Sequence, residues 1–249
     1  MSKGRVTIVD IPIDNLFKSQ LVSAVYTRLE KQQKNTFIVT ANPEIIMAAK
    51  RNDSYQQAIL QADYIIPDGT GVMLASTILS QPLAEKIVGY ELLHTFLSYA
   101  GKQQKSVYFF GSKKGVAEQA AANAETLYPG LVIAGVKDGY SGIGQETVEE
   151  IAACQPDFLF VGLGVPLQEL WIAQHRHLFP CSVLMGVGGS FDVLSGKTKR
   201  APKFWLDWNL EWLYRLITQP TRGVRMIQLP IFVVEVHKQK WRERRYLAK

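Results

Sequence analysis

The stretch Thr36–Glu44, TFIVTANPE, decides the fold of this chain. Its first five residues are β-branched or aromatic, which predicts a buried strand over Thr36–Thr40. Asn42 and Pro43 then favour the start of a helix, because an asparagine side chain can cap the first turn and proline suits the first helical position. A strand that leads directly into a helix is the repeating unit of a parallel α/β sheet.

The same alternation of apolar runs and helical patterns continues through residue 195. It predicts an α/β fold, with a mostly parallel sheet in a Rossmann-like core at 1–195. The sequence GKQQK suggests an exposed connection and a subdivision of this core near residue 105. Further strands are predicted at Tyr64–Ile66, Val107–Phe110, Phe158–Leu163 and Ser182–Val187. Helices are predicted at Pro43–Lys50, Gly71–Leu79, Glu91–Ala100, Val116–Tyr128, Thr147–Ala153 and Gln168–His177.

Residues 196–249 differ from the core in charge and in pattern, which predicts a separate helical C-terminal appendage. They hold 13 Lys/Arg and 4 Asp/Glu, a net charge of +9, whereas residues 1–195 hold 15 basic and 18 acidic residues, a net charge of −3. The pattern predicts two or three amphipathic helices that are broken at Pro220 and Pro230. Such a basic segment indicates an anionic partner, either phosphate groups or a membrane surface.

Three tryptophans of the tail, Trp205, Trp208 and Trp212, are spaced so that they share one face of a predicted helix. Packing of this face on the core fits the spacing. A position in the headgroup region of a membrane fits it as well, because basic residues alternate with the aromatic ones. The sequence leaves both interpretations open.

The composition is that of an ordinary globular protein, with 47% hydrophobic and 20% charged residues among 249. Cys154 and Cys181 lie far apart and the four histidines form no zinc-binding pattern, so we expect neither a disulfide nor a bound metal. No secretion signal and no run of about 18 apolar residues occurs in the chain. We therefore expect a cytoplasmic protein that does not cross a membrane.

Small polar turns follow the predicted strands, at the edge of a parallel sheet where ligands bind. Glycines in such turns let the backbone approach a phosphate, and the next helix offers free N–H groups at its N-terminus. None of the turns is a G-x-G-x-x-G fingerprint or a P-loop, but several together favour a sugar nucleotide or another nucleotide as ligand. The turns are TANPE at 40–44, PDGTG at 67–71, GSKKG at 111–115, GLGVPLQ at 162–168 and GVGGS at 186–190.

Four polar residues in these turns are candidates for the site, and each also has a structural interpretation. Thr40 ends a strand, and Asn42 is a good helix cap. Asp68 lies in a Pro-Asp-Gly turn, where aspartate often bonds its own backbone. The amide of Gln168 opens a helix, where it can bind a sugar hydroxyl or cap the helix. Asp192, in GGSFDVLSG, is a competing carboxylate.

The chain contains no D-x-D pair, so the usual acidic clamp for a metal-bound sugar diphosphate is missing. Cationic side chains and helix N-termini would then have to balance the charge of a diphosphate. The candidates are Lys86 in the core and Arg215, Arg222 and Arg225 in the tail, although an exposed arginine is usually only solvated.

Together these motifs resemble the TagA/WecG/CpsF family of glycosyltransferases (glycosyltransferase family 26), which act in bacterial cell-surface polymer synthesis. The similar stretches span nearly the whole chain in order, and GVGGSFDVLSGKTKRAP is the most specific of them. The others are ANPEI, PDGTG, YPGL, GLGVPLQELW and the LEWLYRL tail with its later arginines.

The resemblance implies an inverting, metal-independent transfer from a UDP-sugar to an undecaprenyl-diphosphate-linked sugar, without a cofactor. In the TagA branch, N-acetylmannosamine passes to the 4-hydroxyl of lipid-linked N-acetylglucosamine in wall teichoic acid synthesis. The implied partners are the UDP-sugar donor, the lipid-diphosphate acceptor and an anionic membrane surface, with the protein peripheral on the inner face of the cell membrane. Apolar helices in the tail could also support a homo-oligomer.

By the same resemblance, Asp68 is expected to be the general base, and Thr40 and Asn42 to bind sugar. Gln168 is expected to be another contact in the active site. The tail arginines named above are expected to close over the site and hold the diphosphate.

Two departures from the family pattern concern the donor. Lys86 stands where arginine is expected, and Glu91 stands where aspartate is usual. A lysine cannot form the two parallel hydrogen bonds of a guanidinium group, so the sugar of the UDP donor is left open between N-acetylmannosamine, its uronic acid and glucose.

Two other classes of protein are weighed against a glycosyltransferase. A nucleotide-dependent Rossmann oxidoreductase is disfavoured because the G-x-G-x-x-G motif is absent. A nucleic-acid-binding module would explain the basic tail but not the polar turns at Asp68 and Gln168.

Overall fold

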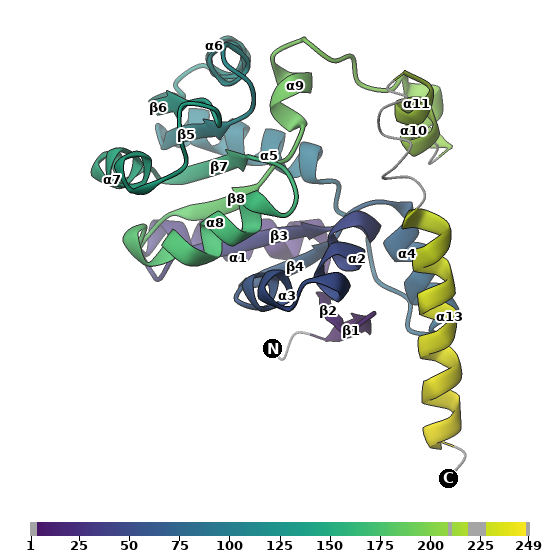
Figure 1. Ribbon diagram of the computed structural model, residues 1–249. Helices are drawn as coiled ribbons and strands as arrows, with labels where there is room; N and C mark the ends of the chain where they lie inside the picture. The colour runs from purple at the N-terminus through teal and green to yellow at the C-terminus, as the bar shows by residue number, and fades with distance from the viewer. Residues whose placement is uncertain (1–3, 209–210, 219–227, 248–249) are drawn as a thin grey trace.

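The computed structural model describes residues 4–208, 211–218 and 228–247. A six-stranded parallel sheet lies at its centre, in the order β4-β3-β8-β7-β5-β6, and helices cover both faces (Figure 1). This confirms the predicted α/β fold. Strands from both sides of residue 105 belong to this one sheet. The strands are β3 (Thr36–Ala41), β4 (Tyr64–Pro67), β5 (Ser106–Gly111), β6 (Val132–Lys137), β7 (Phe158–Gly162) and β8 (Val183–Gly186).

Two hydrophobic clusters hold the layers together, one on each face of the sheet. The first cluster joins the sheet to α2 (Pro43–Arg51), α3 (Asp53–Leu60), α7 (Gln145–Cys154) and α8 (Leu167–His175). The second joins it to α1 (Lys18–Glu30), α5 (Gly89–Gln103), α6 (Val116–Leu127) and α9 (Ser190–Leu194). A sheet covered in this way has no solvated face, which explains why its central strands have continuous apolar sequences.

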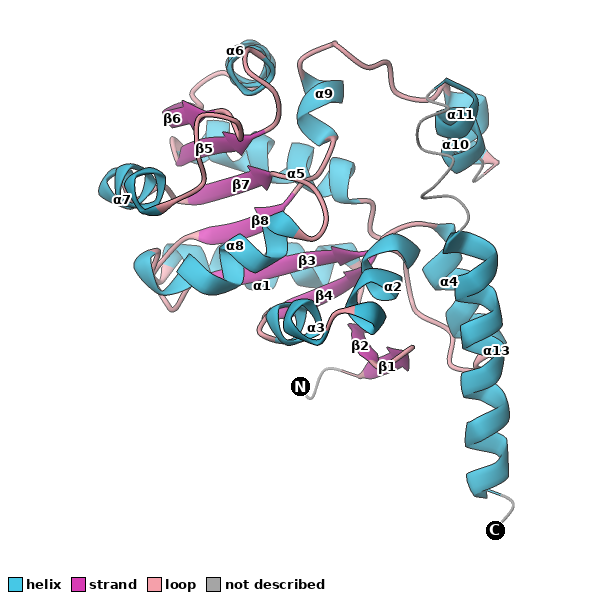
Figure 2. Cartoon of the chain, viewed as in Figure 1, coloured by secondary structure: helices cyan, strands magenta, loops and turns pink. Residues whose placement is uncertain are grey.

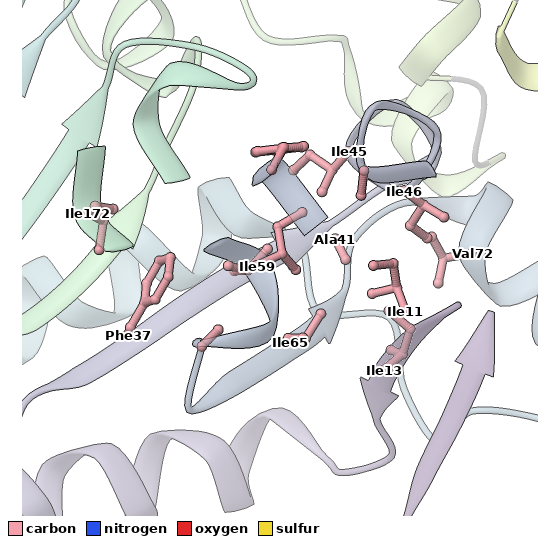
Figure 3. Packing of buried hydrophobic residues seen from close by; sticks show 14 of the residues in the cluster. Ile11, Ile13, Phe37, Ala41, Ile45, Ile46, Ile59, Ile65, Val72 and Ile172 are labelled. Atoms are coloured by element: carbon pink, nitrogen blue, oxygen red, sulfur yellow. The ribbon is translucent and has the colours of Figure 1, made fainter. Parts of the chain in front are cut away.

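Strand β3 shows how successive residues divide between the two clusters. Phe37 and Val39 belong to the first cluster and Ile38 belongs to the second, because neighbouring side chains on a strand point to opposite faces. Figure 3 shows Phe37 and Ala41 of β3 in the first cluster, with Ile45 of α2 and other residues from the neighbouring elements. All six residues of β3 are buried.

An antiparallel hairpin of β1 (Arg5–Ile8) and β2 (Ile11–Asp14) precedes the sheet, and the sequence analysis missed it. Val9 and Asp10 form its turn, both with positive φ, as a two-residue hairpin turn requires. Asp14 is buried and accepts hydrogen bonds from Arg5 Nε at 2.9 Å and from the Ile65 N–H at 2.8 Å. The hairpin is therefore tied to β4.

Four other elements were also not predicted, namely α1, α3, α9 and β6. Strand β6 lies at the edge of the sheet, and most of its residues are only partly buried. Its sequence, VIAGVK, includes a glycine and lacks the apolar run of a central strand.

The tail forms α10 (Lys203–Asp207), α11 (Glu211–Thr218) and α13 (Gln228–Leu247), as Figure 2 shows. The predicted break at Pro230 is wrong, because this proline lies in the first turn of α13, where a missing N–H removes no intrahelical bond. Pro220 lies outside the described residues. Trp205 lies in α10 and Trp208 lies in the turn that follows it, where it is 66% exposed. The side chain of Trp212 is outside what the structure describes, so the shared tryptophan face stays a prediction.

Helix α13 packs on α2 and on α4 (Thr70–Ile78), and it shares the core of the α/β domain (Figure 1). Phe232 and Val236 are buried in the first cluster. Gln239 accepts a hydrogen bond from the Val9 N–H and donates one to the Thr7 carbonyl, each at 2.8 Å. The division predicted at residue 195 thus separates the two parts in sequence, while α13 contributes to the packing of the first part.

We predict that Phe232→Ala lowers the free energy of unfolding by about 3 kcal/mol, because it leaves a cavity where α13 meets the core. Ile231→Ala is the matched control, since Ile231 is the preceding residue and is 45% exposed. Its effect should stay below about 1 kcal/mol. Urea denaturation followed by circular dichroism measures both, and equal effects would show that α13 is not part of the core.

Candidate functional site

The carboxyl ends of β3 and β4 bring the Asp68 turn next to Ala41, the residue between Thr40 and Asn42. The two strands are in parallel register, with Thr40 opposite Ile66 and Ala41 opposite Pro67. The N–H of Asp68 then donates to the Ala41 carbonyl at 2.8 Å, which continues the pairing one residue beyond β4. Asp68 is half-buried. Of the predicted site residues, those of the first two turns are therefore brought together.

Asn42 caps α2, as its sequence position predicted. Its side-chain oxygen accepts a hydrogen bond from the Ile45 N–H at 3.0 Å. Thr40 is 8% exposed, and α5 begins against it. A Cβ atom at Gly89 would lie only 3.1 Å from the Thr40 methyl group, so the glycine allows this close approach. Contact of Thr40 and Asn42 with a sugar stays a prediction.

Lys86 belongs to the segment that runs beside the Asp68 turn. The N–H of Ile87 donates to the Pro67 carbonyl at 2.9 Å, and Lys86 is half-buried. Because Pro67 directly precedes Asp68, the backbone at Lys86 lies next to the same end of β4. The cation predicted in the core is thus near the predicted base in the fold, although 18 positions later in the sequence.

Gln168 joins the turns that follow β7 and β8. Its side-chain oxygen accepts from the N–H of Gly164 at 3.2 Å and from the N–H of Gly188 at 3.0 Å. Its amide nitrogen donates to Glu169 Oε1 at 2.7 Å. Gln168 is only 3% exposed. The side chain therefore has a structural task at the predicted edge of the sheet, and its contact with substrate stays a prediction.

Glu169 is a carboxyl group that the sequence analysis did not select. It is 1% exposed, and it also accepts a hydrogen bond from the hydroxyl of the buried Tyr55 at 2.8 Å. Burial raises the pKa of Glu169 to about 7, and the charge of Glu44 adds to the rise, whereas the bonds from Gln168 and Tyr55 oppose it. The available signal was a glutamate among apolar residues in the helix sequence LQELWI.

The three tail arginines are not placed at the site by the structure. Arg215 belongs to α11, but its side chain is outside what the structure describes. Arg222 and Arg225 lie outside the described residues. Their closure over the site stays a prediction. Asp192, the competing carboxylate, lies in the short helix α9 after β8.

Glu91 forms an ion pair with Arg200, at 2.7 Å between Oε1 and Nη2. Arg200 also lies over the ring of Tyr90, 4.9 Å from its centre. The glutamate that departs from the family pattern thus connects α5 to the GKTKR segment. An open depression of about 430 Å³ is lined by these three residues together with Lys18 and His94.

Within the described ranges, no three His, Cys, Asp or Glu side chains are grouped so that they could hold a metal ion. The metal-independent mechanism stays a prediction. No described helix is long and apolar enough to cross a bilayer.

We predict that Glu169 makes the stability of the protein fall as the pH rises. Its folded pKa of about 7 exceeds the usual 4.5, so the folded state holds the proton more tightly than the unfolded state between these values. The resulting stabilisation is present at low pH and is lost as the pH rises through about 7. At about 1.4 kcal/mol per pKa unit, this amounts to about 2.5 kcal/mol between about pH 5 and pH 8. Denaturation of wild type and Glu169→Gln across this range measures the difference, and parallel curves would contradict it.

Comparison with known proteins assigns the chain to a family. The sequence model of the "Glycosyl transferase WecG/TagA/CpsF family" matches residues 6–246. A relative from Bacillus spizizenii is 44% identical over 222 residues, which cover 89% of this chain and 86% of the relative. Relatives from Bacillus subtilis (37% identical, covering 98% and 95%) and Staphylococcus aureus (40% identical, covering 95% and 94%) are similar over nearly their whole length. All three are named N-acetylglucosaminyldiphosphoundecaprenol N-acetyl-beta-D-mannosaminyltransferase. The chain therefore belongs to the WecG/TagA/CpsF family of glycosyltransferases.

Proposed function

We propose that this protein transfers N-acetylmannosamine from UDP-N-acetylmannosamine to the 4-hydroxyl of undecaprenyl-diphosphate-linked N-acetylglucosamine. Such a reaction builds the linkage unit of wall teichoic acid. The observation that carries the proposal is the position of Asp68, beside Thr40 and Asn42 at the ligand-binding edge of the sheet. The names of the relatives supply the acceptor and the sugar.

In this reaction Asp68 acts as the general base. A sugar hydroxyl is a poor nucleophile, so a carboxylate within hydrogen-bond reach takes its proton as the oxygen attacks the anomeric carbon. Attack from the face opposite UDP inverts that carbon, and one base is enough. Asp68 lies just before Gly69, the N-cap residue of α4.

Cationic groups balance the charge of the leaving UDP in this mechanism. Lys86 supplies one such charge next to the Asp68 turn, and Arg215, Arg222 and Arg225 supply the others from the tail. Fixed positive charges stabilise a developing negative charge more strongly in a closed site than in water. No metal is required if they are in place.

The proposed site of membrane association is the outer face of α13. Its residues 231, 234, 238, 241 and 245 follow helical spacing, and all are exposed. Ile231, Val234 and Trp241 are apolar, while Lys238 and Arg245 are basic, and the guanidinium of Arg245 lies 4.2 Å from the ring of Trp241. A stripe of this composition suits the headgroup region of an anionic leaflet, and this supports a peripheral position on the inner face of the cell membrane.

We predict that Asp68→Asn lowers kcat/KM for sugar transfer by about 10³, because an amide cannot accept the proton of the acceptor. Binding of the UDP-sugar should change by less than about twofold, since the shape of the turn is kept. Asp10→Asn is the control, because Asp10 is an exposed aspartate in the β1–β2 turn. The assay supplies a panel of UDP-sugars, a lipid-diphosphate N-acetylglucosamine acceptor and a chelator. Full turnover by Asp68→Asn would remove the base from this mechanism, and preference for another UDP-sugar would reassign the donor.

We predict that the double variant Ile231→Glu and Val234→Glu binds anionic vesicles at least about tenfold more weakly. The reason is that two exposed apolar groups are lost and two negative charges face the lipid, at about 1 kcal/mol for each charge. Leu127→Glu with Val132→Glu is the control, because these residues are also exposed but lie on α6 and β6, far from α13 in Figure 1. Vesicle sedimentation measures the binding. Equal loss in both double variants would mean that charge alone, without the stripe, sets the affinity.

A further inference from the structure

A buried chain of hydrogen bonds connects α3 to the turns at the carboxyl ends of β7 and β8. Glu169 lies at its centre, with one carboxylate oxygen bonded by Tyr55 and the other by Gln168. The far end of the chain is the Gln168 oxygen, which holds the N–H groups of Gly164 and Gly188. Nothing in the proposed chemistry uses Glu169 or Tyr55 directly.

We propose that Glu169 is a positioning residue for the transfer reaction, which acts by orienting the amide of Gln168 so that its oxygen fixes the two turns beside the site. This inference rests on the proposed function. It adds a role for two residues, Glu169 and Tyr55, that do not touch the substrate.

The hydrogen-bonding chemistry of the groups gives the amide one orientation. An ionised carboxylate can only accept, so it takes the NH₂ group of Gln168 and leaves the amide oxygen for the two backbone N–H groups. A rotated amide would turn its NH₂ group toward two other donors and its oxygen toward a carboxylate. Without Glu169 the amide loses the partner that selects between the two orientations.

The backbone of β8 leaves room for this pair of side chains. A Cβ atom at Gly186 would lie 2.6 Å from the amide nitrogen of Gln168 and 3.1 Å from Glu169 Oε1. A Cβ atom would therefore force the Gln168 amide to move, and the glycine at the end of β8 lets both side chains pack against the strand as they do. The chain of hydrogen bonds is therefore built into the sheet edge and is not an incidental surface contact.

Protonation of Glu169 should weaken the arrangement without breaking it. The groups that set its ionisation are Tyr55 on α3, Glu44 on α2 and Gln168 on its own helix. The added proton must point to Tyr55, because a hydroxyl oxygen can accept whereas an NH₂ group cannot. The bond from Gln168 then ends on a neutral oxygen, and such bonds are about half as strong as those to a charged one. Transfer should therefore slow modestly as the pH falls through the range in which Glu169 titrates.

The test compares steady-state transfer by wild type, Glu169→Leu, Glu169→Gln and Tyr55→Phe, each normalised to folded protein. We expect kcat/KM to fall about 10- to 100-fold in Glu169→Leu, with most of the loss in kcat, because displacement of the two turns would misplace the groups that react. Glu169→Gln resembles the protonated wild type, so its rate should match wild type at low pH and lack the two- to fivefold rise that we expect in wild type above about pH 7. Tyr55→Phe should lie between wild type and Glu169→Leu.

Glu150→Leu and Tyr108→Phe are matched controls. The Tyr108 hydroxyl donates to Glu150 Oε1 at 3.1 Å, so this is a second tyrosine–glutamate pair on the same face of the sheet, between β5 and α7. Neither control should change kcat/KM by more than about twofold, the range expected of a substitution with no link to the site. A merely structural role for Glu169 would lower stability but leave the pH profile of the folded enzyme unchanged.

Hydrogen exchange at the two turns separates this inference from the proposed function. Backbone amides of residues 163–168 and 187–190 should exchange about tenfold faster in Glu169→Leu, whatever reaction the protein catalyses. If wild type transfers no sugar, the proposed function fails while the exchange result still decides the positioning role. Unchanged exchange, or wild-type kcat/KM in Glu169→Leu, would overturn the inference. If Glu169→Leu does not fold, parallel pH profiles for wild type and Glu169→Gln would overturn it.

Discussion

Parallel pairing of β3 with both β4 and β8 is the constraint on which the site depends. Parallel strands end at the same edge, so turns that are far apart in sequence meet there without further contacts. Strand β3 can occupy an interior position in the sheet because Phe37, Ile38 and Val39 are buried, alternately on the two faces. The first polar side chain after them is Thr40, at the strand end. The bond from the Asp68 N–H to the Ala41 carbonyl of β3 then fixes the backbone of Asp68 at this edge.

Helix α13 gives this edge a fixed relation to the outside of the molecule. Lys240 donates to the carbonyl of Ile78 and to the hydroxyl of Ser80, at the end of α4. The other end of α4 begins directly after the Asp68 turn. A surface that bound the outer face of α13 would therefore orient the proposed base as well. The charge pattern of the sequence indicated an anionic partner for the tail, but it gave no sign that α13 shares the core with β1 and β2.

The parts that the sequence predicted are those that local residues determine. Central strands, the Asn42 cap of α2 and the positions of Thr40 and Asp68 follow from short patterns, because burial on both faces and turn chemistry leave a direct trace in the sequence. The β1–β2 hairpin and β6 were missed because short or partly exposed strands leave only a weak hydrophobic pattern in the sequence. Tertiary bonds determine the rest. Glu169 meets Tyr55 across 114 positions, and no pattern within either helix predicts that contact.

Glu169 also shows how stability and function can oppose each other in this fold. A carboxyl group buried in apolar surroundings costs free energy when it ionises, and the raised pKa measures that cost. An apolar side chain at this position would remove the cost, but it would leave the buried Tyr55 hydroxyl without its acceptor. It would also leave the amide of Gln168 without the acceptor that orients it. The cost of burying this carboxyl group is therefore best explained by the contacts it maintains, namely the Gln168 amide and, through it, the turns after β7 and β8 that line the proposed site.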